Sequence, residues 1–210
     1  MKKKNLNLAF LLIIIGVTSC TKYPDRYERN NEQLVDITQY DVKTDFTQFK
    51  NFAIVDSLNL IENNDSTKVL NSEAQNILNR ICSNMTDRGF SKVTKYDSPD
   101  LGIAVSAVIN YSANYFYPGW YWDTWGYYDP WYWGSYYDYS YYYPYYPMAQ
   151  YSYDYGTLII EMYDLKNAAS HNKKLYVVWS SFVRGLVTGN HTQDELNRNI
   201  DQCFIQTPVF

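Results

Sequence analysis

Side chains that could catalyse a reaction are few and scattered in this sequence. His171 and His191 both fall in predicted loops, and neither has a second ligand three or four residues away. Glu161 and Asp164 lie three apart on a predicted strand, which places their carboxylates on opposite faces instead of across one pocket. The sequence has no glycine-rich phosphate loop and no G-x-S-x-G elbow. We therefore predict no catalytic residues, no metal and no cofactor.

One residue does have a predicted chemical role, which is the attachment of lipid. Lys2, Lys3 and Lys4 precede an apolar run of about a dozen residues, which is shorter than the ~20 that a membrane-spanning helix needs. The run ends in Val17-Thr18-Ser19-Cys20, which resembles a bacterial lipobox. Residues 1–19 are predicted to be a cleaved lipoprotein signal peptide, and Cys20 is predicted to carry the acyl chains, palmitate among them.

This signal implies a place in the cell. A lipid-anchored protein belongs to the bacterial cell envelope, where its acyl chains hold it to a membrane. Lys22 is not followed by an acidic run of the kind that resembles a surface-export signal. We therefore expect an outer-membrane lipoprotein that faces the periplasm, attached to the membrane through its lipid.

Two cysteines remain after Cys20, and they are candidates for a disulfide. Cys82 and Cys203 each lie on the apolar stripe of a predicted helix, and export to the envelope permits oxidation. The two thiols could form a bridge if both helices pack on one sheet face. The alternative is that both are buried thiols that behave as small apolar side chains.

An unusual aromatic segment runs between residues 111 and 155. It contains 18 of the 24 tyrosines and 5 of the 6 tryptophans, with four prolines and no Lys, Arg or Glu. Such rings can stack on sugars or sit at a bilayer interface. The candidate contact surface consists of five residues: Trp120, Trp122, Trp125, Trp131 and Trp133. The alternative is a disordered low-complexity spacer.

The charge of the chain argues against nucleic acid as a partner. The formal net charge is −4, and loss of the three signal-peptide lysines takes it to −7. The bases of single-stranded nucleic acid could stack on the rings of the aromatic segment, but the segment has no Lys or Arg to bind the phosphates. A glycan, a membrane interface or another envelope protein is compatible with these residues.

The fold is predicted around one hairpin. Residues 156–164 and 174–184 are rich in β-branched and aromatic side chains on both faces, and a turn-prone segment separates them. Apolar residues at three- and four-residue steps predict a helix over 67–88, started by Ser66 or Thr67 and ended by Gly89. Residues 49–56, 90–96 and 101–111 are predicted strands, and 59–66 a polar turn. A second helix is expected after Thr192.

These elements predict an α/β protein built as a two-layer sandwich. We expect a mixed, mostly antiparallel sheet of about five strands with two helices, plus the long aromatic-rich insert. The expected organisation is a signal peptide at 1–19, a flexible tether at 20–39 and a single domain at 40–210, with the insert at 111–155. Deletion of residues 115–150 is expected to leave the sandwich folded.

Several short motifs together resemble a family of bacterial lipoproteins described as domain of unknown function 4136. The motifs lie at residues 40–41, 45–46, 49–50, 88–90, 99–101, 156–160, 163–164, 204 and 208. The sequence departs from the family pattern after Trp179, where Ser180-Ser181 stands, and in the length of its tyrosine-rich insert. The resemblance implies an envelope location and an α/β domain, and it supplies no activity.

Three functions remain in view. The first is a non-catalytic envelope lipoprotein that displays an aromatic interaction loop for a glycan, a membrane interface or a protein partner. The second is an envelope glycan-active enzyme that uses the aromatic segment as a substrate platform. The third is a structural or assembly lipoprotein with a disordered spacer loop.

Overall fold

The structure is a computed structural model that describes residues 35–62, 65–109, 130–137, 141–142, 144, 156–184 and 192–207. All of these residues belong to one compact unit. The predicted signal peptide and Cys20 lie outside the described residues. No helix among the described residues is long and apolar enough to cross a membrane.

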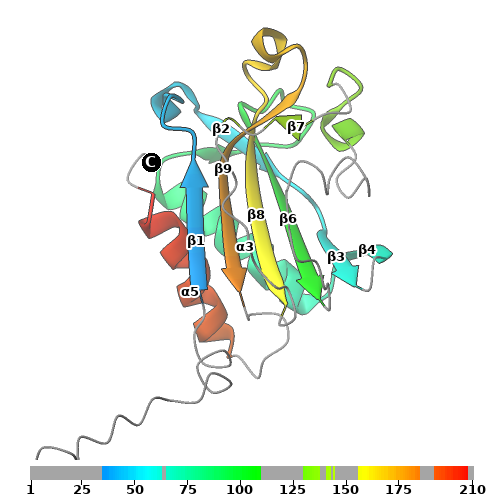
Figure 1. Ribbon diagram of the computed structural model, residues 1–210, viewed down its shortest axis with the longest axis vertical. Coiled ribbons are helices and arrows are strands. Elements are labelled where there is room, and N and C mark those ends of the chain that lie inside the picture. The colour runs from blue at the N-terminus through cyan, green and yellow to red at the C-terminus, as the bar shows by residue number, and fades with distance from the viewer. Residues whose placement is uncertain are drawn as a thin grey trace, which may run out of the picture. The chain divides into compact units, whose positions relative to one another are not determined.

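The described residues form one mixed sheet covered by helices. Figure 1 shows α3 (Ser72–Asp87) and α5 (Gln193–Ile205) side by side behind the strands. The nine strands found in the described ranges are β1 (Val35–Tyr40), β2 (Asn51–Ile54), β3 (Leu58–Glu62), β4 (Asp65–Val69), β5 (Ser91–Lys92), β6 (Leu101–Ile109), β7 (Tyr141–Tyr142), β8 (Thr157–Asp164) and β9 (Leu175–Arg184). The predicted two-layer α/β class is confirmed, although the sheet has more strands than the five expected.

The centre of the sheet is antiparallel and its margins are mixed. The main path runs β1-β9-β8-β6-β2-β5, and β1, β9, β8 and β6 pair antiparallel along it. β2 and β3 both pair parallel with β6, and β7 pairs parallel with β9. β3 also pairs antiparallel with β4.

The predicted hairpin is confirmed as β8 and β9, and both of its faces are buried. All eight residues of β8 are buried, as its largely apolar faces predict, and Thr157, Glu161 and Asp164 are buried with them. The ladder shifts register by a β-bulge between Met162 and Tyr163. Trp179 of β9 stacks on Phe204 of α5 with ring centroids 5.2 Å apart, and its indole N–H donates to the Thr207 hydroxyl over 2.7 Å. The hairpin thus carries the core that joins the sheet to α5.

Strand β1 lies where the sequence predicts part of a flexible tether. The expectation that ordered structure starts near Tyr40 is wrong, because Val35–Tyr40 pairs along its full length with β9. Thr38 donates a hydrogen bond to the carbonyl of Cys203 over 3.1 Å, which ties the strand to α5. The alternation of Val35 and Ile37 with polar residues is too short a pattern to stand out from the polar segment before it, and the strand pairs with β9 far along the chain.

The segment before α3 also differs from the prediction. The predicted polar turn at 59–66 and the helix start at Thr67 are wrong, because β3 and β4 form a hairpin there. Leu58 and Ile61 of β3 are buried. β4 is an exposed, polar edge strand, and the sequence alone does not distinguish it from a loop. Asn71 caps α3 by accepting a 2.8 Å hydrogen bond from the backbone N–H of Ala74.

The end of α3 and the start of α5 are set by nearby residues. Gly89 has φ +90°, the left-handed conformation predicted to stop α3. Thr192 and Glu195 form a capping box at the start of α5. The predicted stripe of α3 is buried from Ala74 to Met85, whereas Leu70 precedes the helix and is 60% exposed. Arg80 of α3 pairs with Asp201 of α5 and holds the two helices together.

Candidate functional site

The predicted tryptophan surface is not what the structure presents. Trp120, Trp122 and Trp125 lie outside the described residues, and Trp131 lies in the short 3₁₀ helix η2 (Pro130–Trp133). Trp133 is only 6% exposed, so its predicted place on a contact surface is wrong. Part of the aromatic insert is therefore packed into the domain.

Trp133 is buried because its indole covers a glycine in the sheet. A Cβ atom at Gly102 of β6 would lie 3.1 Å from two carbons of the indole and 2.9 Å from the Leu165 side chain. The indole also meets Tyr163 edge-on, with ring centroids 6.3 Å apart. Deletion of residues 115–150 would uncover this contact, so the expectation that the sandwich tolerates that deletion does not fit the structure.

Tyr132, the neighbour of Trp133 in η2, is also held by contacts with the domain. Its hydroxyl accepts a 3.0 Å hydrogen bond from the backbone N–H of Asp56. The ammonium of Lys95 lies 3.9 Å from the centroid of the Tyr132 ring, in cation–π contact. Burial raises the pKa of Tyr132, so its hydroxyl stays neutral at physiological pH. Tyr132 and Trp133 are thus anchors of the insert, and neither offers an open ring face.

Two exposed aromatic rings lie on a surface that we call the tyrosine face, which consists of Tyr136 and Tyr142 with the partly buried Tyr176 and His171. Tyr136 is 50% exposed and Tyr142 is 49% exposed. Strand pairing places Tyr142 of β7 opposite Tyr176 of β9, with ring centroids 5.0 Å apart. The His171 imidazole stacks on Tyr176 at 4.1 Å. The tyrosine face is a built set of aromatic rings on the surface.

The polar atoms around the tyrosine face are already engaged. Tyr176 forms a hydrogen bond with the buried Asp41 carboxylate, and burial together with that negative charge raises its pKa to about 12. Asp41 also accepts from the Lys43 backbone N–H over 3.0 Å and from the Thr44 hydroxyl over 2.9 Å. The Tyr176 hydroxyl is therefore held by Asp41, and the exposed rings of the tyrosine face are those of Tyr136 and Tyr142.

Two lysines are exposed near the tyrosine face in the described part of the chain. The Lys173 ammonium lies 4.9 Å from the centroid of the Tyr136 ring, and Lys43 is exposed beside the buried Asp41. Asp164, which lies 3.9 Å from the His171 Nε2, is 3% exposed and accepts from the backbone N–H and the side-chain amide of Asn167, each over 2.8 Å. Among the described residues, the exposed charges next to these rings are thus lysines, while Asp41 and Asp164 are buried.

The described part of the chain contains no set of side chains arranged for catalysis. His191 lies outside it, and His171 is a partner of Tyr176, with its Nε2 3.9 Å from an Asp164 oxygen. Glu161 is buried and accepts a 2.8 Å hydrogen bond from the Tyr163 hydroxyl. The described residues contain no group of three or more His, Cys, Asp or Glu side chains suited to a metal ion.

The two candidate disulfide cysteines are unbridged. Cys82 and Cys203 are both free thiols, so the predicted disulfide is absent from this structure. The Cys203 thiol donates to the carbonyl of Asn199 over 3.2 Å, and burial raises its pKa to about 12. Cys203 thus acts as a buried apolar side chain, which is the alternative considered from the sequence.

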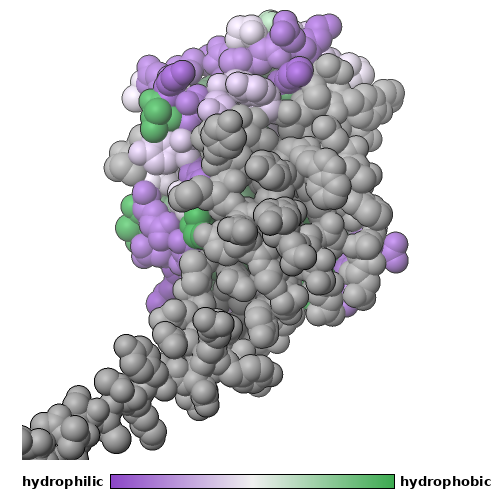
Figure 2. Space-filling view, in the orientation of Figure 1, coloured by the Kyte–Doolittle hydropathy of each residue, from purple (hydrophilic) through white to green (hydrophobic). Residues whose placement is uncertain are grey.

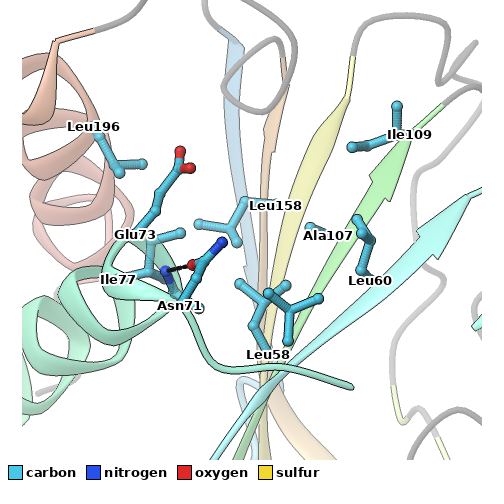
Figure 3. Close-up of a pocket in the computed structure, with 11 residues that line it drawn as sticks. Leu58, Leu60, Asn71, Glu73, Ile77, Ala107, Ile109, Leu158 and Leu196 are labelled. Carbon is cyan, nitrogen blue, oxygen red and sulfur yellow. Dashed lines mark hydrogen bonds between the residues drawn. The ribbon is translucent and has the colours of Figure 1, made fainter. Parts of the chain in front are cut away.

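An apolar pocket lies on the helix-covered face of the sheet. Its volume is about 210 Å³, and nine of its eleven lining residues are aliphatic. Figure 3 shows Ile77 of α3 and Leu158 of β8 facing each other across it, with Leu60 and Ile109 towards one side. Asn71 and Glu73, at the start of α3, are its polar members.

Sequence reasoning missed both the tyrosine face and the pocket. It selected tryptophans within the insert, whereas the exposed rings that the structure describes are tyrosines and a histidine. Tyr176 is an ordinary alternating residue of β9, and Tyr142 is one of 18 tyrosines in the insert. Nothing in a single sequence distinguishes the tyrosine that pairs with β9 from its neighbours.

Comparison with known proteins places the chain in one family. The family model described as Domain of unknown function (DUF4136) matches residues 36–209. A solved DUF4136 family protein from Bacteroides thetaiotaomicron VPI-5482 is 31% identical with a TM-score of 0.69, and the match covers 84% of this chain and 96% of that one. No curated protein matches the chain.

Two further solved structures are more distant. The PelC dodecamer from Paraburkholderia phytofirmans is 8% identical with a TM-score of 0.39, covering 80% of this chain and 94% of that one. A PDZ domain protein from Parabacteroides distasonis ATCC 8503 is 16% identical with a TM-score of 0.43, covering 87% and 38%. At these values neither supports an inference about this chain.

Proposed function

Because this chain belongs to the DUF4136 family, whose function is unknown, we propose a function from its own residues: a lipid-anchored, non-catalytic protein of the bacterial envelope that binds an acidic glycan. The observation that carries this proposal is the tyrosine face, where the exposed rings of Tyr136 and Tyr142 accompany the exposed Lys173. Sugars stack on aromatic ring faces, and phenol hydroxyls donate hydrogen bonds to them. Ammonium groups attract the carboxylates or phosphates of an acidic glycan.

The proposed anchor is Cys20. Acyl chains on this residue would contribute ~0.8 kcal/mol for each buried CH₂, which gives stable attachment without a spanning helix. Cys20→Ser should move the protein from the membrane fraction to the soluble fraction. An unmodified N-terminus in mass spectrometry of the wild type would contradict the proposed anchor and the outer-membrane location.

The direction of β1 favours a glycan over the membrane as the partner of the tyrosine face. β1 starts with Val35 beside Arg184 and ends with Tyr40 beside Trp179. Tyr176 lies three residues before Trp179 in β9, so the tyrosine face is at the end of the sheet where β1 finishes. Cys20 precedes Val35 by fifteen residues, so an anchored chain enters the domain at the opposite end.

The surroundings of the tyrosine face agree with a water-exposed role. Figure 2 shows hydrophilic side chains over the top of the molecule, where Figure 1 draws the turns before β2 and between β8 and β9. A segment that inserts into a bilayer interface needs an apolar margin around its aromatic rings. The hydrophilic turns at this end instead suit a soluble or wall-bound polysaccharide.

The test compares two exposed tyrosines. Purified Cys20→Ser protein would be titrated with soluble peptidoglycan fragments and probed on a glycan array that contains acidic and neutral glycans. Tyr142→Ala should weaken glycan binding by about tenfold, because the variant loses one stacking face. Tyr96→Ala is the matched control, since Tyr96 is 84% exposed and lies outside the tyrosine face.

Several outcomes would contradict the proposal. If the wild type binds no glycan, or Tyr96→Ala and Tyr142→Ala lose affinity equally, the tyrosine face is not the site. If acidic and neutral glycans bind with equal affinity, the lysines do not contribute to glycan recognition. Release of shortened glycan products during the titration would favour the enzyme alternative.

A further inference from the structure

We propose that the pocket on the helix-covered face of the sheet binds a single alkyl chain, contributed by a membrane lipid whose head group is uncharged or zwitterionic. This site is separate from the tyrosine face, and neither proposal depends on the other for its ligand chemistry. The lining of the pocket, the charge at its rim and its place in the fold each support the same occupant.

The lining of the pocket suits a methylene chain. Its floor consists of buried aliphatic side chains, among them Leu58, Ile77, Ala107 and Leu158. None of the eleven lining residues is aromatic, although aromatic residues make up 19% of the chain. A flat ring or a sugar is usually held by aromatic side chains, whereas a flexible alkyl chain needs only aliphatic contact.

The size of the pocket limits what can enter. An apolar cavity of ~150 Å³ holds a molecule as large as benzene, and drug-sized ligands occupy ~300–1,000 Å³. A volume of about 210 Å³ lies between these two, which fits the end of one chain and excludes a bulky ligand. The rest of the bound lipid would therefore remain outside the pocket.

The rim of the pocket is accessible and carries one charge. Leu60 and Ile109 are half-buried, and Glu73 is exposed in the first turn of α3. The side chain of Asn71 already caps the helix. The Glu73 carboxylate would repel an anionic head group at the entrance, and it would tolerate an uncharged, zwitterionic or cationic one. A free fatty acid is thus disfavoured relative to an esterified lipid.

The pocket lies near the end of the sheet from which the proposed anchor leaves. Leu158 and Ala107 are paired, and Leu158 adjoins Thr157, which pairs with Arg184 beside Val35. Val35 is the start of β1, fifteen residues after Cys20. An anchored domain would thus present this end towards its membrane, where lipid acyl chains are available. This placement rests on the proposed lipid anchor, whereas the lining and the rim charge do not.

The experiment uses amphiphiles that share a chain and differ in charge. Purified Cys20→Ser protein, which lacks its own lipid as a competitor, would be titrated calorimetrically with dodecyl maltoside, dodecyltrimethylammonium and dodecanoate below their micellar concentrations. We expect saturable one-to-one binding of the first two, and about fivefold weaker binding of dodecanoate. In a series of alkyl maltosides, affinity should rise about fourfold for each methylene until the pocket is filled.

Two variants locate the binding. Leu60→Trp fills the pocket from its rim and should abolish binding, whereas Ile205→Trp places the same ring at an exposed aliphatic position outside the pocket and should leave binding unchanged. Glu73→Gln should bring dodecanoate to the affinity of dodecyl maltoside. Ile109→Trp repeats the test from another rim position if Leu60→Trp fails to fold.

The proposal is overturned if no amphiphile binds saturably, if Leu60→Trp and Ile109→Trp bind as the wild type does, or if affinity is independent of chain length. Tyr142→Ala should bind dodecyl maltoside normally. Loss of glycan binding with retained alkyl binding, or the reverse, therefore distinguishes the failure of one proposal from the failure of the other.

Discussion

The indole of Trp133 lies against the backbone of Gly102, so close that a Cβ atom at residue 102 would force both the indole and the Leu165 side chain to shift. This contact joins the aromatic insert to the central strand β6. It explains why a segment of unusual composition contributes to the core of the domain and cannot be treated as a removable loop.

The first prediction tests this contact. Gly102→Val should lower the free energy of unfolding by ~1–3 kcal/mol, because the added methyl groups overpack the site. Trp133→Ala should cost ~3–5 kcal/mol, because it leaves a cavity above β6. Urea unfolding followed by circular dichroism measures both, with Tyr96→Ala as an exposed control expected within ~0.5 kcal/mol. An unchanged midpoint for Trp133→Ala would show that the indole is not part of the core.

The second prediction concerns where the folded domain begins. A protein that starts at Tyr40 lacks most of β1 and should unfold at a lower urea concentration than one that starts at Thr21. The shorter chain loses the pairing with β9 and the hydrogen bond from Thr38 to the Cys203 carbonyl. Hydrogen exchange along β9 should also become faster, because this strand becomes an edge. Equal stability of the two proteins would mean that β1 adds nothing to the fold.

The third prediction follows from a half-buried carboxylate in β1. Burial raises the pKa of Asp36 from 3.8 to about 6, and its Oδ1 atom has no hydrogen-bond partner among the described residues. Because the folded pKa is the higher one, the protonated form contributes stability that is fully present below about pH 4. This stability is lost as the pH rises through about 6. The wild type should therefore be more stable at pH 4 than at pH 7 by the share that Asp36 contributes.

The matched variant is Asp36→Asn, which keeps the shape and removes the charge. It should raise the free energy of unfolding at pH 7 by on the order of 1 kcal/mol, since solvent screens the half-exposed group, and it should flatten this part of the pH profile. Denaturant unfolding at pH 4, 5, 6 and 7 measures both effects. A variant that is destabilised equally at every pH would assign Asp36 a hydrogen-bonding role instead.

The fourth prediction separates the two thiols. Cys82 is partly exposed and should react with iodoacetamide under native conditions. Cys203 should resist until the protein unfolds, because it is buried and its pKa is raised to about 12. Mass spectrometry of peptides after native and denaturing alkylation reads out each site. A Cys82–Cys203 linked peptide from the envelope-derived protein would restore the disulfide that the sequence suggested.

The sequence by itself determined the elements whose signal is local. The β8–β9 hairpin follows from its density of β-branched and aromatic residues, and the start of α5 follows from the Thr192 capping box. Gly89 ends α3 because a left-handed residue is needed there. Each of these depends on residues a few positions apart, so one sequence is enough to predict them. The two-layer α/β class follows from the same elements.

Only the tertiary structure decided the features that join distant segments. Polar β4 and short β1 are strands because β3 and β9 supply their hydrogen bonds, and their own patterns are too polar or too short to indicate this. Trp133 is buried because Gly102, 31 residues earlier, leaves room for it. Tyr142 meets Tyr176 through a two-residue parallel pairing, and the aliphatic pocket takes its walls from strands and helices spread over the chain. Burial of a particular side chain depends on which surfaces meet in space, and composition does not encode that meeting.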